Sequence, residues 1–293
     1  MTTLGSHSGK FHADDVFAIA ALSILHPDYE IIRSRDPEDW AKCDYLVDVG
    51  GVYDHEKKIY DHHFRNGPTY EDGLPMSSVG LIWKHYGADI CQSAEIAERI
   101  CKKLIRTLDA HDNGIELTVK ADNGYSVSDV SVSALLSVMN PSDFSKADEV
   151  FEEEVIRARK VLLAYIAKAQ KWFNSKQETL EAISKANSAA KKYIEVSQEC
   201  NFMEHLLNSE DGNEILYVMY PNDGKWYART VAGDLGSFDD RKSFPDKWAG
   251  LRDEEFSKVA GIPDGVFCHH STFICGSYSH ESTVKLIEMA IEA

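Results

Sequence analysis

No stretch of this 293-residue chain approaches the roughly 20 consecutive apolar residues that a membrane-spanning helix requires. Residues 1–10 are polar and rich in Gly and Ser, with neither an apolar signal core nor an Arg-rich presequence. None of the cysteines forms a C-x-x-C pair, so neither a structural zinc site nor a disulfide framework is predicted. These absences predict an intracellular protein that does not enter a membrane.

Basic residues are also few, with 31 Lys and Arg against 48 Asp and Glu and a formal net charge of -17. This balance argues against broad electrostatic attraction to nucleic acid, because phosphate neutralisation needs basic side chains. It does not exclude a phosphate substrate, since bound divalent cations can be the largest local charges in a site. The sequence contains no G-x-S-x-G elbow, no P-loop and no G-x-G-x-x-G fingerprint, which disfavours the corresponding nucleophilic and nucleotide-binding classes.

The apolar patterns of the first third alternate in type and predict an α/β domain with a mostly parallel sheet. Helical spacing of apolar residues indicates helices at 12–25 and 92–109, and Ser77 and Ser78 are expected to cap another that ends at Gly87. Short strands are expected at residues 1–7, 29–34, 45–49 and 59–62.

The middle of the chain is helical, with a long amphipathic run at 146–175 that suits a packing helix or a connector between domains. After it, Pro221 to Gly224 form a strong hairpin turn between two apolar runs. Further strands are expected at 266–268 and 272–275, with a last helix at 280–292. We therefore expect two domains, residues 1–175 and a smaller α+β domain at 176–293.

Histidine and aspartate gather in four segments of the first 114 residues, and three of the four follow predicted strands. Ligands gather at the carboxyl ends of strands in an open α/β sheet. Each residue also has a simpler interpretation: Asp14 and Asp15 suit the first turn of a helix, and Asp48 suits a turn. Four such segments together are harder to explain in this way, because buried charges without partners are costly. The segments are 7–15, 47–51, 61–63 and 109–114.

Imidazole and carboxylate groups together suit Mn, Zn, Co or Fe. Two such ions can hold both the attacking and the leaving oxygen of a phosphoryl group. Asp48 or Asp61 could bridge the ions, and a histidine that is not a ligand could protonate the leaving group. The pattern thus predicts a metal-dependent phosphoesterase.

The chain also resembles a known family in the order of its longer motifs. His62 and His63 complete an Asp-His-His signature that is typical of the DHH phosphoesterase superfamily. The wider set resembles the MYG family (melanocyte proliferating gene family) of that superfamily. This set comprises His7-x4-His12-x-Asp14, residues 33–37, 47–51 and 60–63, Asp109-x2-Asp112-Asn113-Gly114, and residues 248–252, 261–264 and 266–269.

The resemblance implies a DHH-type catalytic domain at 1–175, a domain at 176–293 that closes over the substrate, and two divalent metal ions. Mn²⁺ is the expected ion, with Mg²⁺, Co²⁺ or Zn²⁺ as alternatives. Asp61, His62 and His63 are the expected catalytic residues, with Asp61 orienting a neighbour or His63 acting as the acid. The implied metal ligands are His7, His12, Asp14, Asp48, His62, Asp109 and Asp112, the last an alternative to Asp109.

The implied activity is that of a 3′–5′ RNA exonuclease that releases nucleoside monophosphates. Family members act in the nucleus, nucleolus or mitochondria; without a targeting extension, cytoplasm or nucleus is expected here rather than mitochondrion. Phosphate clamping suits arginine geometry, and the candidates are Arg33, Arg35, Arg241 and His269.

Three positions depart from the family pattern: Asp15 stands where Glu is usual, Leu135 where Arg is expected, and Cys275-Gly276 where a Gly pair is expected. These departures leave the metal chemistry intact but weaken the case for a long polynucleotide. A small-molecule phosphohydrolase acting on pyrophosphate or short nucleotides is therefore the alternative. A non-catalytic scaffold with a relic site is a third hypothesis, which the nearly complete ligand set disfavours.

Overall fold

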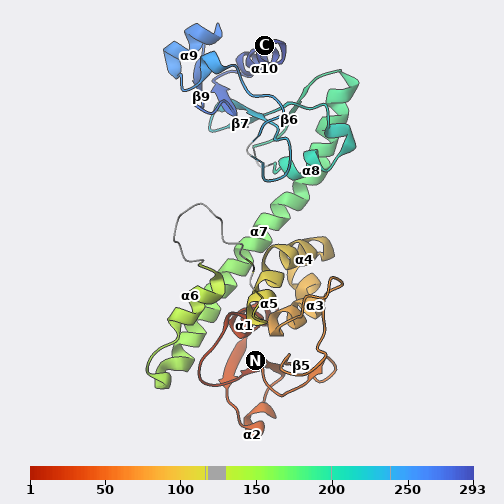
Figure 1. Ribbon diagram of the computed structural model, residues 1–293, viewed down its shortest axis with the longest axis vertical. Coiled ribbons are helices and arrows are strands. Elements are labelled where there is room, and N and C mark those ends of the chain that lie inside the picture. Colours follow the sequence, from red (N-terminus) through yellow and green to blue (C-terminus); the bar gives the residue numbers. More distant parts are fainter. Residues whose placement is uncertain (116, 118–129, 199, 238) are drawn as a thin grey trace. The chain divides into compact units, whose positions relative to one another are not determined.

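The computed structural model describes residues 1–115, 117, 130–198, 200–237 and 239–293. The chain divides into two compact units, Met1–Ala169 and Gln170–Ala293 (Figure 1). Among the helices of the described residues, none combines the length and the hydropathy needed to cross a bilayer.

The first unit is built on a five-stranded sheet in the order β2-β1-β3-β5-β4. Strand β1 pairs in parallel with β2 and β3, and β3 pairs in parallel with β5, while β4 is an antiparallel edge strand. This arrangement confirms the predicted α/β class with a mostly parallel sheet. The strands are β1 (Thr2–Ser6), β2 (Tyr29–Arg33), β3 (Tyr45–Val47), β4 (Tyr53–Asp54) and β5 (Ile59–Tyr60).

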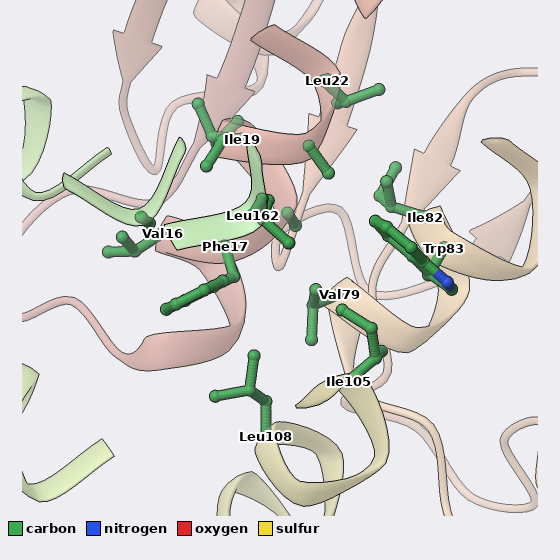
Figure 2. Close-up of a cluster of buried hydrophobic side chains, with 14 of the residues drawn as sticks. Val16, Phe17, Ile19, Leu22, Val79, Ile82, Trp83, Ile105, Leu108 and Leu162 are labelled. Carbon is green, nitrogen blue, oxygen red and sulfur yellow. The ribbon is translucent and has the colours of Figure 1, made fainter. Parts of the chain in front are cut away.

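Helices pack around this sheet and form a common apolar core (Figure 2). Nearly the whole of α1 is buried, as expected for a helix that is apolar on most of its faces. Its residues Phe17 and Leu22 share the core with Trp83 of α3, Leu108 of α5 and Leu162 of α7. The helical elements are α1 (Ala13–Leu25), α2 (Pro37–Trp40), α3 (Ser78–Cys91), α4 (Ala94–Ile100), the π-helix η1 (Cys101–Ile105), α5 (Arg106–Asp112), α6 (Val132–Met139), the 3₁₀ turn η2 (Phe144–Lys146) and α7 (Ala147–Ser188).

Helix α3 runs past Gly87 to Cys91, so the predicted stop at Gly87 is wrong. A side chain at Gly87 would place its Cβ 2.9 Å from the indole Nε1 of Trp83. The glycine therefore makes room for Trp83 on the helix surface and does not end the helix. The helix predicted at 92–109 is likewise divided into α4, η1 and α5, and α7 is longer than the predicted run 146–175.

The second unit contains a five-stranded sheet in the order β6-β7-β8-β10-β9, in which β6–β7 is parallel and the other pairs are antiparallel. The predicted hairpin joins β7 to β8 through Asp223 and Gly224, which both have positive φ as a type I′ turn requires. The remaining elements are β6 (Tyr193–Glu195), α8 (Met203–Leu207), η3 (Glu210–Gly212), β7 (Tyr217–Asn222), β8 (Lys225–Thr230), η4 (Asp246–Trp248), α9 (Asp253–Ala260), β9 (Gly265–Cys268), β10 (Ile274–Ser277) and α10 (His280–Glu292).

Candidate metal centre

The parallel strands of the first unit deliver His and Asp side chains to one edge of the sheet. His7 directly follows β1, Asp48 follows β3, and His62 lies two residues after β5. Because the carboxyl ends of parallel strands meet at the same edge, residues far apart in sequence converge there. Asp48 has φ 56°, in the left-handed region that aspartate tolerates better than most residues.

Among the residues that the structure describes, three overlapping groups of possible ligand atoms lie at this edge, and within each group the atoms are no more than 4.8 Å apart. Asp48 belongs to two groups and His12 to two, so the groups form one continuous cluster. The groups are His7, His12 and Asp48; Asp48, His62 and His63; and His12, Asp14 and Asp112. The first turn of α1, with His12 as its N-cap, and the end of α5 complete the cluster.

Asp48 is the centre of this arrangement. Its Oδ2 lies 3.2 Å from Nε2 of His7, and its Oδ1 lies 3.3 Å from both Nε2 of His62 and Nδ1 of His63. Burial raises the pKa of Asp48, but hydrogen bonds with these three imidazoles outweigh it and hold the pKa far below its usual range. The carboxylate is therefore ionised at neutral pH and can bind cations on both oxygens.

Asp14 and Asp15 are fully buried beside Asp48. Burial and the neighbouring carboxylates raise the pKa of Asp14 well above its ordinary value. Burial also raises the pKa of Asp15, to about 7. Burying several carboxylates this close together costs free energy unless a bound cation balances their charge.

Buried polar atoms without a hydrogen-bond partner mark the same place. Among the described residues they include Asp14 Oδ1 and Asp15 Oδ2. Asp15 suits the first turn of α1, and its Oδ1 does accept a hydrogen bond from the His12 backbone N–H at 2.9 Å. Its Oδ2 also lies 3.4 Å from Nε2 of His7, so the residue is part of the cluster as well. The donor set fits divalent cations.

The two adjacent histidines have different surroundings. The side chain of His62 is 9% exposed, and its Nε2 lies 3.1 Å from Oδ2 of Asp112 and 3.7 Å from Oδ2 of Asp14. Burial lowers its pKa, but hydrogen bonds with Asp112 and Asp48 raise it to about 10. The side chain of His63 is 62% exposed, and a hydrogen bond with Asp48 is the main cause that raises its pKa to about 9.

Asp61 anchors the loop that carries these histidines. Its Oδ2 accepts a hydrogen bond from the Gly51 N–H at 2.6 Å, and its Oδ1 accepts one from the His63 N–H at 3.0 Å. Oδ1 also lies 2.9 Å from Nδ1 of His63. Asp61 is thus placed to orient His63 and belongs to none of the three donor groups found among the described residues.

The structure separates the two aspartates of α5. Asp112 reaches His62, whereas Asp109 points to the start of α3 and lies outside the three donor groups. The Asp109 carboxylate accepts hydrogen bonds from the Ser77 hydroxyl at 2.7 Å and the Tyr70 hydroxyl at 2.7 Å. Burial raises the pKa of Asp109 to about 6, although these hydrogen bonds lower it. Of the two candidates, Asp112 is the one with the geometry of a ligand.

An open pocket of about 720 Å³ lies over the cluster, within the size range of small-molecule sites. Several of its residues were not among the predicted site residues. Most of these residues lie next to the motifs in the sequence. Ser133 and Ser137 lie on α6, which contains no motif that would have predicted them. The lining consists of Phe11, His12, Ala13, His62, His63, Phe64, Arg65, His111, Asp112, Asn113, Ser133 and Ser137.

The four predicted phosphate contacts differ in availability. Arg33 is 1% exposed in its side chain and donates hydrogen bonds to Asp148 and to the Gly9 carbonyl. Arg241 donates hydrogen bonds to the carbonyl oxygens of three residues, Gly212, Asn213 and Ile215. Both guanidinium groups therefore have structural partners.

Arg35 lies beside the cluster, with Nη2 3.3 Å from Nδ1 of His7. His269 lies in the second unit, where its Nδ1 accepts a hydrogen bond from the Ser271 N–H at 3.1 Å. Arg35 is the predicted phosphate contact that the structure places next to the metal donors.

The fold and the site together define an α/β protein with a candidate centre for divalent cations. Residues 3–291 match the profile of MYG1_exonuc, an uncharacterised protein family (UPF0160), and the chain belongs to this family. The membership that the motifs predict is confirmed.

Relatives match over nearly the full length. The chain is 32% identical to the MYG1 protein YER156C of Saccharomyces cerevisiae, with 98% of this chain and 94% of the relative covered. It is 30% identical to the MYG1 exonuclease of Homo sapiens, with 97% and 84% covered. RecJ of Thermus thermophilus, solved with Mn²⁺, matches at 13% identity and a TM-score of 0.23. This match covers 99% of the chain and 52% of RecJ, so the chain spans about half the length of that protein.

Proposed function

We propose that this protein is a metal-dependent phosphodiesterase that shortens RNA from its 3′ end and releases nucleoside monophosphates. The observation that carries the proposal is the overlap of the donor groups on Asp48, beneath an open pocket large enough for a nucleotide. The name of the human relative, MYG1 exonuclease, supports the same class of reaction.

The donor set would suit two divalent cations, and Asp48 belongs to two of the three donor groups among the described residues. His7 and His12 would hold one, while His62, Asp14 and Asp112 would hold the other. Imidazole and carboxylate together favour Mn²⁺, with Mg²⁺, Co²⁺ or Zn²⁺ as alternatives. When bound, such a pair supplies charge neutralisation at the phosphoryl group and lowers the pKa of a coordinated water.

The protein's own residues would then orient the substrate and move the proton. His63 is exposed at the pocket and oriented by Asp61, which suits an acid that protonates the leaving oxygen. Ser133 and Ser137 of α6 line the same pocket and suit contacts to a ribose hydroxyl. We assign the chemistry and these pocket contacts to residues 1–175, and further substrate contacts to residues 176–293.

The second candidate function is hydrolysis of pyrophosphate or short nucleotides. The net charge of -17 favours it, because a long polyanion would be repelled outside the pocket. Leu135 of α6 also favours it, since an exposed leucine stands where the family pattern has an arginine.

The test incubates purified protein with 5′-end-labelled RNA in Mn²⁺ or in chelator. The proposal predicts a ladder of shortened RNA and free nucleoside monophosphates in Mn²⁺ alone, with no shortening by Asp48→Asn. The matched control is Asp89→Asn, because the side chain of Asp89 is exposed and makes no hydrogen bond or ion pair within the described part of the chain. Phosphate release from pyrophosphate without RNA shortening would establish the second candidate.

A further inference from the structure

We infer that Asp109, held by Tyr70, is a positioning residue that fixes the N-terminus of α3 and, through it, the metal-site carboxylates of Asp14 and Asp48. The inference rests on the proposed function for the identity of the metal site. It assigns Asp109 a role different from that of a ligand.

The carboxylate of Asp109 holds the N-terminus of α3 by hydrogen bonds. Asp109 is 0% exposed, and its Oδ1 accepts hydrogen bonds from Ser77 N–H at 3.1 Å, the Ser77 hydroxyl at 2.7 Å and Gly80 N–H at 3.1 Å. Ser77 is the N-cap of α3 but makes no cap hydrogen bond with its own side chain. The carboxylate of Asp109 thus caps α3 from another helix, where an anion is also favoured by the helix dipole.

Gly80 shows how closely the two helices approach at this point. A Cβ built on Gly80 would lie 2.2 Å from Oδ2 and 2.7 Å from Oδ1 of Asp109. The carboxylate therefore occupies the space that any larger residue at position 80 would need. Tyr70 fixes the second oxygen, because its hydroxyl donates to Oδ2 at 2.7 Å.

Ser78, the residue after the N-cap of α3, contacts two carboxylates of the metal site. The Ser78 N–H donates to Oδ2 of Asp14 at 3.3 Å, and its hydroxyl donates to Oδ1 of Asp48 at 3.2 Å. Ser77 and Ser78 are adjacent, so a shift of the Asp109–Ser77 contact moves the donors to both carboxylates. Partners of this kind commonly tune metal affinity by roughly 10- to 100-fold.

The geometry also separates this arrangement from the pocket above the metal donors. Tyr70, Gly80 and Cys101 line a different cavity of about 370 Å³. Substitutions at Tyr70 therefore change the support of the carboxylates without adding or removing a group in the pocket that contains His62 and His63.

The experiment compares Mn²⁺ affinity, by isothermal titration calorimetry, for wild type, Asp109→Ala, Asp109→Asn and the control Asp89→Asn. Asp109→Ala removes the three hydrogen bonds that the carboxylate accepts from Ser77 and Gly80, and we expect Mn²⁺ binding to weaken by roughly 10- to 100-fold. Asp109→Asn keeps an oxygen that can accept from Ser77 and Gly80, so affinity should stay within about threefold of wild type. A metal ligand would not tolerate this exchange.

The outcomes separate the inference from the function on which it rests. Equal weakening by Ala and Asn would overturn the positioning role in favour of direct ligation, and no weakening by Ala would overturn it as well. If Asp109→Ala does not fold, Tyr70→Phe replaces it; a weaker Mn²⁺ affinity supports the inference and an unchanged affinity contradicts it. Absence of Mn²⁺ binding by folded wild type would instead reject the proposed function.

Discussion

The imidazole of His62 meets the carboxylate of Asp112, with Nε2 3.1 Å from Oδ2, although one residue follows β5 and the other ends α5. Asp109 lies on the same helix one turn earlier and faces Ser77 and Gly80. A single helix thus supplies a candidate ligand and the support for other ligands, because residues three apart share a helix face.

The difference in exposure between His62 and His63 predicts different effects of their removal. We expect His62→Ala to lose Mn²⁺ affinity by at least roughly 10-fold, because its buried Nε2 lies among three carboxylates. We expect His63→Ala to keep most of the affinity but to lose about 10²- to 10⁴-fold in kcat, as for a general acid. Calorimetry and single-turnover kinetics measure the two quantities, and a reversed pattern would exchange the proposed roles.

The pKa values predict how the stability of the metal-free protein depends on pH. The folded-state values of Asp15 (about 7) and His62 (about 10) lie above their unfolded values, so their stabilising contributions are complete below the unfolded pKa and are lost as pH rises through the folded pKa. The pKa of Asp48 is lowered, so its contribution is lost only in acid, below its ordinary range.

We therefore expect the free energy of unfolding of chelator-treated protein to fall between pH 5 and pH 9, by an amount on the order of a few kcal/mol. Added Mn²⁺ should reduce this fall, because cations favour the deprotonated ligands. Denaturant titrations across this range provide the measurement. A free energy that rises or stays level without metal would contradict the assignment.

The contacts of Arg241 and Arg35 predict opposite consequences for stability and activity. Arg241→Ala should lower the free energy of unfolding by about 1–3 kcal/mol, because three backbone carbonyls lose their donor. Arg35→Ala should leave stability nearly unchanged and raise KM for RNA, since Arg35 lies beside His7 at the edge of the site. Thermal melts and steady-state kinetics distinguish these effects. If Arg241→Ala keeps the melting temperature of wild type and raises KM, Arg241 contacts the substrate phosphate as the sequence predicts.

Much of the fold follows from local patterns. The strand and helix types of the first third are correct because short apolar runs and helical spacing persist over whole elements, as in β3 and α1. The convergence of His7, Asp48 and His62 follows from the parallel sheet itself, since the ends of its strands share one edge.

Other features depend on partners that the sequence does not mark. Asp109 and Asp112 have equivalent positions in their motif, and only the packing of α5 against Ser77 and Gly80 distinguishes them. Gly87 is a local signal for the end of a helix, but α3 continues past it because the glycine leaves space for the side chain of Trp83. Arg33 likewise donates a hydrogen bond to Asp148, which is far away in the sequence, and no rule of residue spacing predicts that pair.

The most direct test counts the Mn²⁺ ions bound per chain, by equilibrium dialysis and elemental analysis of wild type, Asp48→Asn and Asp89→Asn. Because Asp48 contacts His7 on one side and His62 on the other, we expect two ions for wild type and for Asp89→Asn, and loss of tight binding at both positions for Asp48→Asn. Wild type that binds no Mn²⁺, or Asp48→Asn that retains both ions, would contradict this expectation.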